Sequence, residues 1–388
     1  MSARGTTYFC GLRKITHAGG DRRGALAFCD DLSNETVTMA EQSLPMLSSG
    51  PDAAPPSFTS VLSLFSGHAI VRAIAVVAEL GIADALAAGP LTAGELARRC
   101  EAHEESLFRI MRALAAVGVF TQTSAPARFG LNPLSNWLRS DVPSSLRDFA
   151  RVRGGEFCWD AWRTLGEASK TGKCAFELAH GTDFFDYLQQ HPDAASVFNH
   201  GMRSLSSQVY GAVIRAYDFS RFRTLTDVGG GSGGFIAALL SAHPGLSGTL
   251  FERAAAIELS GEILRTGGVL DRCRCIAGNF FEAVPGGSEA ILLSRVVHDF
   301  SDQDVLRILR NCHAALPRGG KLLIVEYVVT DDAEGTAAKL FDLHMLAYFG
   351  PARERTREEF EALLNASGFT LQQVVRSSAS IAVIEATS

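Results

Sequence analysis

The chain has 388 residues, a formal net charge of −6 and a hydrophobic share of 47%, with a sequence pI of about 6.0. This length allows two hydrophobic cores, and the composition is that of an ordinary globular protein. Because there is no overall positive charge, we expect neither nucleic acid nor an anionic membrane as a partner.

The eight cysteines are scattered along the chain. Only Cys273 and Cys275 form a close C-x-C pair, so we expect no metal site and no disulfide framework. The sequence shows no apolar run of membrane-spanning length and no secretory signal pattern. We therefore expect a cytoplasmic protein with reduced thiols.

The first 57 residues mix charged residues, Gly, Ser and Pro without a sustained period, and residues 48–56 resemble a linker. We expect residues 1–57 to be a disordered or poorly ordered extension.

Residues 58–205 are expected to form a mainly helical domain. Apolar residues recur at helical spacing from Val71 to Leu80, and Thr92 with Glu95 predicts the capped start of a second helix. A third helix is expected over 106–117, followed by a short hairpin over 119–122 and 128–132. Helices followed by a two-stranded wing indicate a winged-helix domain, which in other proteins often reads DNA.

A DNA-binding regulator is therefore the rival class of protein. The charge of the expected recognition helix distinguishes between the two classes. The segment 101–112, which would contain the recognition helix, carries Glu101, Glu104 and Glu105 against Arg109 and Arg112. A helix that faces phosphates is normally net basic. We therefore favour a dimerisation domain that gives a homodimer.

A further helical stretch, 145–217, is rich in aromatic residues. We expect most of them in the core and some in the wall of a pocket for a flat aromatic substrate. Together with the segment 342–349, this stretch supplies the candidate substrate residues Phe157, Trp162, Met345 and Phe349.

From residue 225 onward, short apolar strands alternate with helical patterns, with strands expected at 248–252, 274–278, 290–294 and 321–326. Such alternation predicts an α/β fold with a doubly wound, mostly parallel sheet. The last two strands, 370–375 and 379–385, are joined by too few residues for a crossover, so they should pair antiparallel. We place this second domain at residues 206–388.

The most informative segment is the glycine-rich turn after the first of these strands. Gly229, Gly231 and Gly234 satisfy the dinucleotide pattern G-x-G-x-x-G. Asp227, Gly229, Gly231 and Gly233 fit D-x-G-x-G-x-G better, the pattern seen with S-adenosylmethionine (SAM). A carboxylate beside the turn suits a ligand with an ammonium group and would repel a pyrophosphate.

Two later positions complete the expected nucleotide site. Glu252 ends the second strand, 21 positions past Gly231, where an acid can bind ribose hydroxyls. Gly278, Asn279 and Phe280 follow the third strand and could stack on and hydrogen-bond an adenine.

A candidate proton acceptor, His298, follows the fourth strand at the edge where open α/β sheets place their sites. A lone histidine is more often structural, but two acids occupy comparable positions. Glu326 ends the fifth strand, and Glu354 lies in the loop before a helix that Thr356 and Glu359 should cap.

From about residue 60 to the C-terminus, the sequence resembles the SAM-dependent O-methyltransferases of the caffeic acid and hydroxyindole type, including bacterial enzymes of secondary metabolism. The matching segments are 198–202, 227–231, 278–281, 294–302, 317–321 and 353–356.

The resemblance implies a Rossmann-like methyltransferase domain, SAM as cofactor with S-adenosylhomocysteine as product, and dimerisation through the N-terminal domain. It implies that His298 is the general base, flanked by Glu326 and Glu354. We further expect Asp299 among the substrate contacts. The further cofactor contacts that we expect are Met202, Ser206, Arg253, Ser294 and Arg295.

Two positions depart from the family pattern. Asn279 stands where the family usually has Asp, so its adenine contact requires the amide oxygen to face the adenine amino group. Phe300 stands where Trp is usual, which should be a conservative packing change.

The sequence thus predicts transfer of the SAM methyl group to the hydroxyl of a small aromatic substrate, without a metal. A SAM-assisted hydroxylation or decarboxylation on the same fold is the second reading, although intact His298, Glu326 and Glu354 argue against it. A winged-helix DNA-binding regulator is the third.

Overall fold

The computed structural model describes residues 58–124, 126–143, 145–332 and 335–388. The expected N-terminal extension, residues 1–57, lies outside the described residues. Residues 61–388 form one compact unit. Among the described residues, no helix is long and apolar enough to cross a membrane.

The N-terminal region has the expected helices and wing. The capping box of Thr92 and Glu95 is present, and the third predicted helix begins two residues early because His103 caps it through the Ser106 N–H. Three short antiparallel strands pair in the order β1-β3-β2. The elements are α1 (Phe58–Phe65), α2 (Gly67–Glu79), α3 (Ile82–Ala85), β1 (Leu91–Thr92), α4 (Ala93–Arg99), α5 (Glu104–Ala116), β2 (Thr121–Gln122), β3 (Arg128–Gly130) and α6 (Pro133–Asn136).

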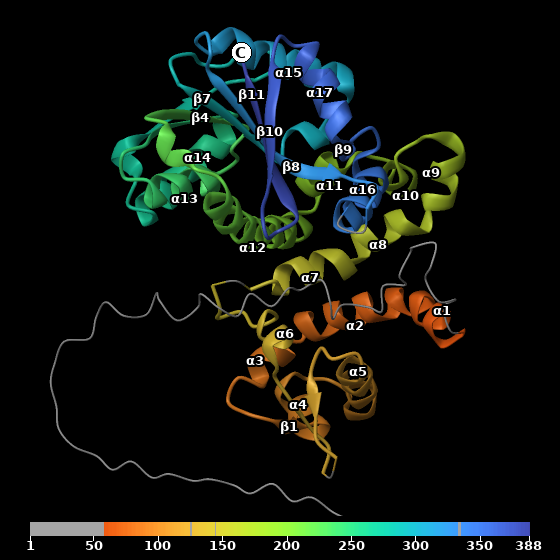
Figure 1. Ribbon diagram of the computed structural model, residues 1–388. Helices are drawn as coiled ribbons and strands as arrows, with labels where there is room; N and C mark the ends of the chain where they lie inside the picture. The colour runs from red at the N-terminus through yellow and green to blue at the C-terminus, as the bar shows by residue number, and fades with distance from the viewer. Residues whose placement is uncertain (1–57, 125, 144, 333–334) are drawn as a thin grey trace, which may run out of the picture. The chain divides into compact units, whose positions relative to one another are not determined.

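Six helices then lead to the sheet domain. Helix α7 packs against both α2 and α12, so it joins the N-terminal helices to the rest of the unit (Figure 1). The expected boundary between residues 205 and 206 falls inside α12, which continues to Ala216. The helices are α7 (Arg147–Gly154), α8 (Glu156–Arg163), α9 (Leu165–Thr171), α10 (Ala175–His180), α11 (Phe184–Gln190) and α12 (Pro192–Ala216).

The C-terminal domain is built on a mostly parallel sheet in the order β10-β11-β8-β7-β4-β5-β6, with β9 pairing β8. As expected, β10 and β11 pair antiparallel. The elements are β4 (Thr224–Val228), α13 (Gly234–Ala242), β5 (Ser247–Glu252), α14 (Ala254–Thr266), β6 (Cys273–Ala277), β7 (Ala290–Ser294), α15 (Asp302–Ala315), β8 (Lys321–Val329), α16 (Thr336–Phe349), β9 (Arg355–Thr356), α17 (Arg357–Asn365), β10 (Thr370–Arg376) and β11 (Ile381–Thr387), with short 3-10 turns at Phe219–Arg221, Leu270–Arg272 and Val297–Asp299.

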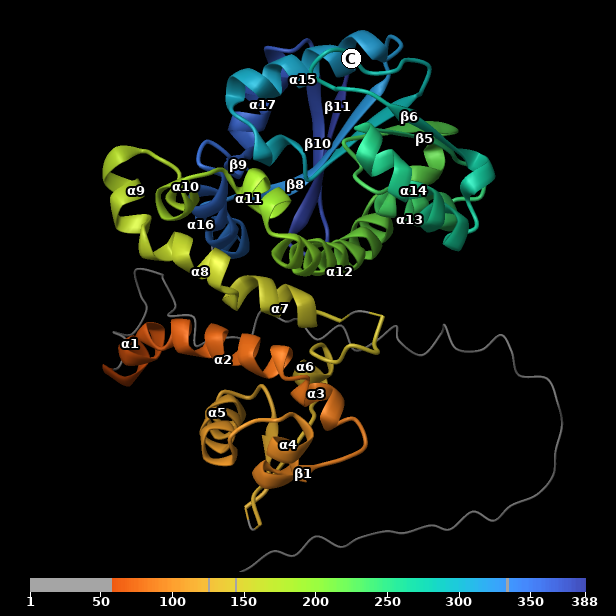
Figure 2. The same ribbon diagram turned by 180° about the vertical axis from the view of Figure 1, so that it is seen from behind.

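The central strands β7 and β8 are largely buried on both faces, which explains why they are nearly continuous apolar runs. In β7, Ala290 and Leu292 face a core with α12, α13 and α14, whereas Ile291 and Leu293 face a second core with α15 and α17. Figure 2 shows these two helical layers on opposite sides of the strands. Strand order reverses between β4 and β7, so the loops after these strands flank the crevice where such folds bind ligands.

Candidate active site

A loop of clustered glycines joins β4 to α13 at the carboxyl edge of the sheet. Gly229, Gly231 and Gly233 have positive φ values of 72°, 56° and 85°, which residues with a Cβ rarely adopt. At Gly230 the constraint is space, because a Cβ there would overlap the carboxylate of Asp227. The loop therefore needs glycine at each of these positions to keep its backbone tight against Asp227.

The carboxylate of Asp227 is the unusual group of this loop. Asp227 is fully buried, and among the described residues neither of its carboxylate oxygens accepts a hydrogen bond of good geometry. Burial and the charge of Glu252 raise the pKa of Asp227 to about 7, although the Ile236 backbone N–H lowers it in part. A buried carboxylate without a full partner is unfavourable on its own. The ammonium group of SAM has the charge that this position lacks, so the residues present fit that ligand.

The expected ribose-binding acid lies against the same loop. Glu252 accepts a hydrogen bond from the Gly231 N–H (3.2 Å) and another from the Arg253 N–H (2.7 Å). The Arg253 side chain is largely exposed beside it, 3.7 Å away. The fold thus brings Glu252 to the glycines.

The residues expected to bind adenine follow β6. A Cβ on Gly278 would overlap the ring of Phe251, so glycine is required there, and the ring of Phe280 borders Gly229. Asn279 is exposed, accepts a hydrogen bond from the Phe281 N–H (3.0 Å) and donates one to Glu282 (3.1 Å). Its amide oxygen is thus engaged locally, and its adenine contact stays a prediction.

The three expected catalytic residues come together at the carboxyl edge of the sheet: His298 lies in the turn after β7, Glu354 in the loop before β9, and Glu326 inside β8. The expectation that Glu326 ends its strand is wrong, because β8 continues for three residues to Val329, where it pairs with β9. His298 is buried, and its Nδ1 lies 2.9 Å from Oε1 of Glu354. Its backbone N–H donates to Oε1 of Glu326 (3.3 Å), and its Nε2 lies 3.3 Å from Oδ1 of Asp299. A carboxylate only accepts hydrogen bonds, and the contact of Nδ1 with Glu354 is shorter than that of Nε2 with Asp299, so it favours the proton on Nδ1 and leaves Nε2 as the acceptor.

Burial sets the protonation states in this cluster. Burial and the neighbouring Arg295 lower the pKa of His298, so the imidazole is neutral at neutral pH. Burial also raises the pKa of Glu326 and raises the pKa of Glu354 to about 7, opposed by Arg295. The cluster therefore holds a neutral proton acceptor among buried acids.

Arg295 holds the two glutamates together. Its guanidinium donates to Glu326 (3.0 Å) and Glu354 (3.2 Å) and lies over the rings of Tyr327 (4.9 Å) and Phe341 (4.7 Å). Its backbone φ is +57°, a strained value for a residue with a side chain. We expected Arg295 beside the cofactor. The structure places its charged group on the catalytic acids, and a cofactor contact stays a prediction.

A second arginine fixes the turn that carries His298. Arg355 is fully buried and donates to the backbone oxygens of Val297 (2.9 Å) and Phe300 (2.8 Å) and to Asp302 (2.7 Å). The Arg353 N–H donates to the carbonyl of His298 (2.9 Å). The Arg-Glu-Arg segment therefore supplies both Glu354 and the clamp. The sequence contained this motif, but only Glu354 was assigned a role.

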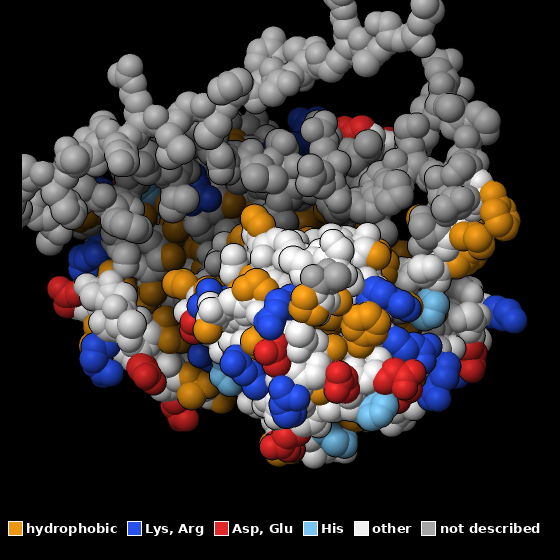
Figure 3. Space-filling model, turned by 90° about the horizontal axis from the view of Figure 1, so that it is seen from below, with side chains coloured by type: hydrophobic (Ala, Val, Ile, Leu, Met, Phe, Trp, Pro, Cys, Tyr) orange, Lys and Arg blue, Asp and Glu red, His pale blue; other side chains and the backbone are white. Residues whose placement is uncertain are grey.

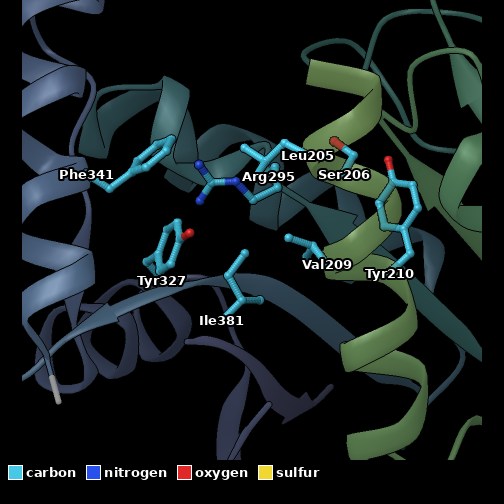
Figure 4. A pocket seen from close by; sticks show the side chains of 8 residues that line it. All are labelled: Leu205, Ser206, Val209, Tyr210, Arg295, Tyr327, Phe341 and Ile381. Carbon is cyan, nitrogen blue, oxygen red and sulfur yellow. The ribbon is translucent and has the colours of Figure 1, made fainter. Parts of the chain in front are cut away.

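A small cavity of about 30 Å³ adjoins the cluster. Figure 4 shows Arg295, Tyr327 and Phe341 facing Ser206 of α12 across it. Ser206 was an expected cofactor residue, as were Met202, four residues earlier on the same helix, and Ser294 at the end of β7. Sequence reasoning missed Tyr327 and Phe341, since nothing in the local pattern separates them from ordinary core aromatics.

The expected substrate residues divide into two groups. Trp162 donates a hydrogen bond from Nε1 to the Tyr348 hydroxyl (2.8 Å), and its ring centroid lies 4.9 Å from that of His344. Asp299 contacts His298 through Oδ1. Phe157, Met345 and Phe349 are instead packed among other apolar side chains, with Phe157 and Phe349 both in the aromatic core beside α11. Among the described residues, the ring contact of His298 is with Phe341 and not with Phe157 or Phe349.

The sheet, the glycine loop, the unpartnered Asp227 and the histidine with its acids define a SAM-dependent methyltransferase. Comparison with known proteins gives the family. Residues 162–370 match the O-methyltransferase domain model, and residues 62–141 match the O-methyltransferase dimerisation domain model. The chain belongs to the O-methyltransferase family and is a SAM-dependent O-methyltransferase.

Similar proteins come from bacterial secondary metabolism. The phenazine O-methyltransferase PhzM of Lysobacter antibioticus is 40% identical over 86% of this chain and 97% of its own. The mitomycin biosynthesis 6-O-methyltransferase of Streptomyces lavendulae is 40% identical over 81% and 89%. A solved O-methyltransferase from neocarzinostatin biosynthesis, in complex with S-adenosylhomocysteine and 1,4-dihydroxy-2-naphthoic acid, has a TM-score of 0.70 at 30% identity, covering 86% of this chain and 100% of its own.

Proposed function

We propose that the chain methylates a hydroxyl of a small aromatic acceptor, with His298 as the general base. One observation carries the proposal. Nδ1 of a buried, neutral His298 is held by Glu354, which makes Nε2, beside Asp299, the nitrogen that can accept a proton at the sheet edge that also holds the glycine loop.

The residues of the cluster divide the work. SAM, when bound, supplies the methyl group and leaves as S-adenosylhomocysteine. A phenol with a pKa near ~10 is neutral at pH 7, so His298 takes its proton through Nε2 as the new C–O bond forms. Glu354 keeps the imidazole in the required tautomer, and both glutamates stabilise its charged form. Holding the reacting atoms in line supplies much of the rate.

The cofactor site proposed here is the edge formed by the glycine loop and the strand ends beside it. The unpartnered Asp227 and the contact of Glu252 with the loop support it. Its residues are Met202, Ser206, Asp227, Gly229, Gly231, Gly233, Glu252, Arg253, Gly278, Asn279, Phe280, Ser294 and Arg295.

The acceptor is proposed to be flat and aromatic. Two of the similar proteins are named for a phenazine and for mitomycin biosynthesis. A third was crystallised in complex with 1,4-dihydroxy-2-naphthoic acid. In this chain, a row of rings leads away from His298: Phe341 contacts His298, His344 contacts Phe341, and Trp162 contacts His344. These rings support the proposal of an aromatic acceptor.

The test is the variant His298→Ala. SAM binding by calorimetry should be unchanged, while methyl transfer to an accepted phenol, followed by mass spectrometry, should fall by about 10² to 10⁴. The matched control is His313→Ala, because His313, in α15, packs on Phe369 and has no ring contact or ion pair with the cluster among the described residues. If His298→Ala turned over like the parent, the assignment of the base would be wrong.

The protein is proposed to act as a homodimer in the cytoplasm, without nucleic acid. The dimerisation domain match and the exposed apolar side chains of α1 and α2 support the dimer. Figure 3 shows Lys and Arg side chains interspersed with Asp and Glu on the face seen from below, a pattern unlike a continuous basic stripe. The six cysteines of the described residues are free thiols, as is usual in a reducing compartment.

A further inference from the structure

A second cationic side chain, Arg153 of α7, adjoins the reaction cluster. Its guanidinium lies over the rings of Phe149 (5.2 Å) and Phe341 (5.8 Å) and is close enough to Tyr348 for this residue to act on the pKa of Arg153. The ion pairs of the neighbouring arginines on α7 and α8 join Arg151 to Asp148 and Arg163 to Asp160. Among the described residues, no carboxylate forms an ion pair with Arg153.

The contrast with Arg295 is informative because both guanidinium groups lie against the ring of Phe341. Arg295 is neutralised by Glu326 and Glu354. Among the described residues, the groups around the half-buried Arg153 are aromatic rings, hydroxyls and the Cys158 thiol rather than carboxylates, and burial lowers the pKa of Arg153. A cation held without a counter-charge in such surroundings is costly, unless an anion joins it.

An unpartnered polar atom lies in the same region. The Nδ1 atom of His344 is buried without a hydrogen-bond partner, and burial together with Arg153 lowers the pKa of His344 to about 3. The imidazole is therefore neutral and has one nitrogen unused. A neutral imidazole can donate one hydrogen bond to an anion.

Arg153 and the proposed base, His298, lie near the same aromatic ring, that of Phe341. Phe341 lies 6.3 Å from His298 between ring centroids and 6.0 Å from His344. The base and the unpaired cation thus share one aromatic neighbour. An aromatic acceptor with its hydroxyl at His298 would extend along the rings that also surround Arg153.

We propose that Arg153, aided by His344, forms an anion subsite of the acceptor pocket and that the acceptor is an aromatic hydroxy acid. The proposal rests on the proposed function. Arg is suited to this role because its planar fork binds a carboxylate through two hydrogen bonds.

The charges of the site then orient the acceptor. Glu326, Glu354 and Asp299 surround His298 and would repel a carboxylate at the base. Arg153 would attract the carboxylate at the other end. The acid group should therefore face α7, so that a hydroxyl away from the carboxylate is methylated.

The experiment compares an acid with its neutral analogues in the full-length enzyme. The probes are 6-hydroxy-2-naphthoate, its methyl ester and its carboxamide, assayed with SAM. The parent enzyme should prefer the acid in kcat/KM by about ten- to a hundredfold. Arg153→Met should erase this preference mainly by raising KM for the acid, and Arg153→Lys should retain part of it. The control is Arg163→Met, since Arg163 is exposed on the neighbouring α8.

Three results would overturn the anion subsite. The parent enzyme could prefer the ester, or Arg153→Met could reduce turnover of all three probes equally, which is the signature of a structural role. Calorimetry of the S-adenosylhomocysteine complex could also show equal naphthoate affinity in the parent and in Arg153→Met. Failure of the proposed function is distinct, because no probe would then be methylated by the parent enzyme even where the acid binds tightly.

Discussion

At the scale of single residues, the site depends on one cation that is shared by two buried acids. Arg295 contacts Glu326 and Glu354, 31 and 59 positions away in sequence, and it lowers the pKa of His298 as well. The sequence motifs located His298, Glu326 and Glu354, since His298 follows a strand, Glu326 interrupts an apolar strand and Glu354 lies in a recognisable loop. The ion pairs by which Arg295 joins the two glutamates depend on tertiary contacts and on a strained backbone at Arg295. The local sequence could not predict either feature.

The pH dependence of activity should depend on the positive charge of Arg295. Arg295→Met removes a positive charge near His298, so the pKa of His298 should rise. A base with a higher pKa is protonated earlier as the pH falls. The acid limb of the kcat/KM profile should therefore move to higher pH, by roughly one unit, in profiles recorded between about pH 5 and 8. Arg295→Lys keeps the charge and should leave the limb near its parent position. A lower rate with an unmoved limb would show that Arg295 does not tune the base.

At the scale of elements, the alternation of strands and helices predicted the doubly wound sheet, most clearly at β7 and β8, which are nearly continuous apolar runs. The antiparallel pairing of β10 and β11 was predicted from the short connection between them. Strands β1 and β9 were not predicted, since two residues show no period. The extent of α12 was also not predicted. Its 25 residues, which begin at Pro192, form one unbroken helix across the position where we expected the domain boundary.

The glycine loop is the element on which SAM binding should depend most. In Gly230→Ala, the new Cβ would overlap Asp227 and lie 2.7 Å from a side-chain carbon of Leu250, so the backbone must move. We expect a loss of about 1–3 kcal/mol in unfolding free energy and a SAM affinity at least about tenfold weaker, since the loop and Asp227 shift together. Thermal unfolding and calorimetry measure the two effects.

The matched control for this loop is Gly245→Ala. No atom lies within 4 Å of a Cβ at Gly245, and its φ is not in the left-handed region. This variant should keep both parent stability and parent SAM affinity. Equal SAM binding by Gly230→Ala would show that the tight loop is not needed for the cofactor.

At the scale of the whole molecule, large apolar side chains are exposed close together at two places on the described surface. The exposed fractions of Leu62, Leu64 and Phe65 are 48%, 51% and 71%, and these residues lie in or next to the matched dimerisation domain. On α16, Leu340, Leu343 and Leu346 are likewise exposed and share one side of the helix at spacing i, i+3, i+6. Contiguous exposed apolar side chains usually mark an interface.

If α1 is part of a dimer interface, charge placed there should separate the copies. The double variant Leu62→Glu with Phe65→Glu would bury two unpaired carboxylates in the interface, a cost that apolar packing does not offset. Sedimentation should find the parent protein at twice its 41.5 kDa chain mass and the variant at that chain mass. The control is Leu259→Glu on α14, because Leu259 is 68% exposed but lies outside the matched dimerisation domain. Since each copy holds its own glycine loop and His298, the separated variant should still bind SAM. A variant that remained a dimer would exclude α1 from the interface.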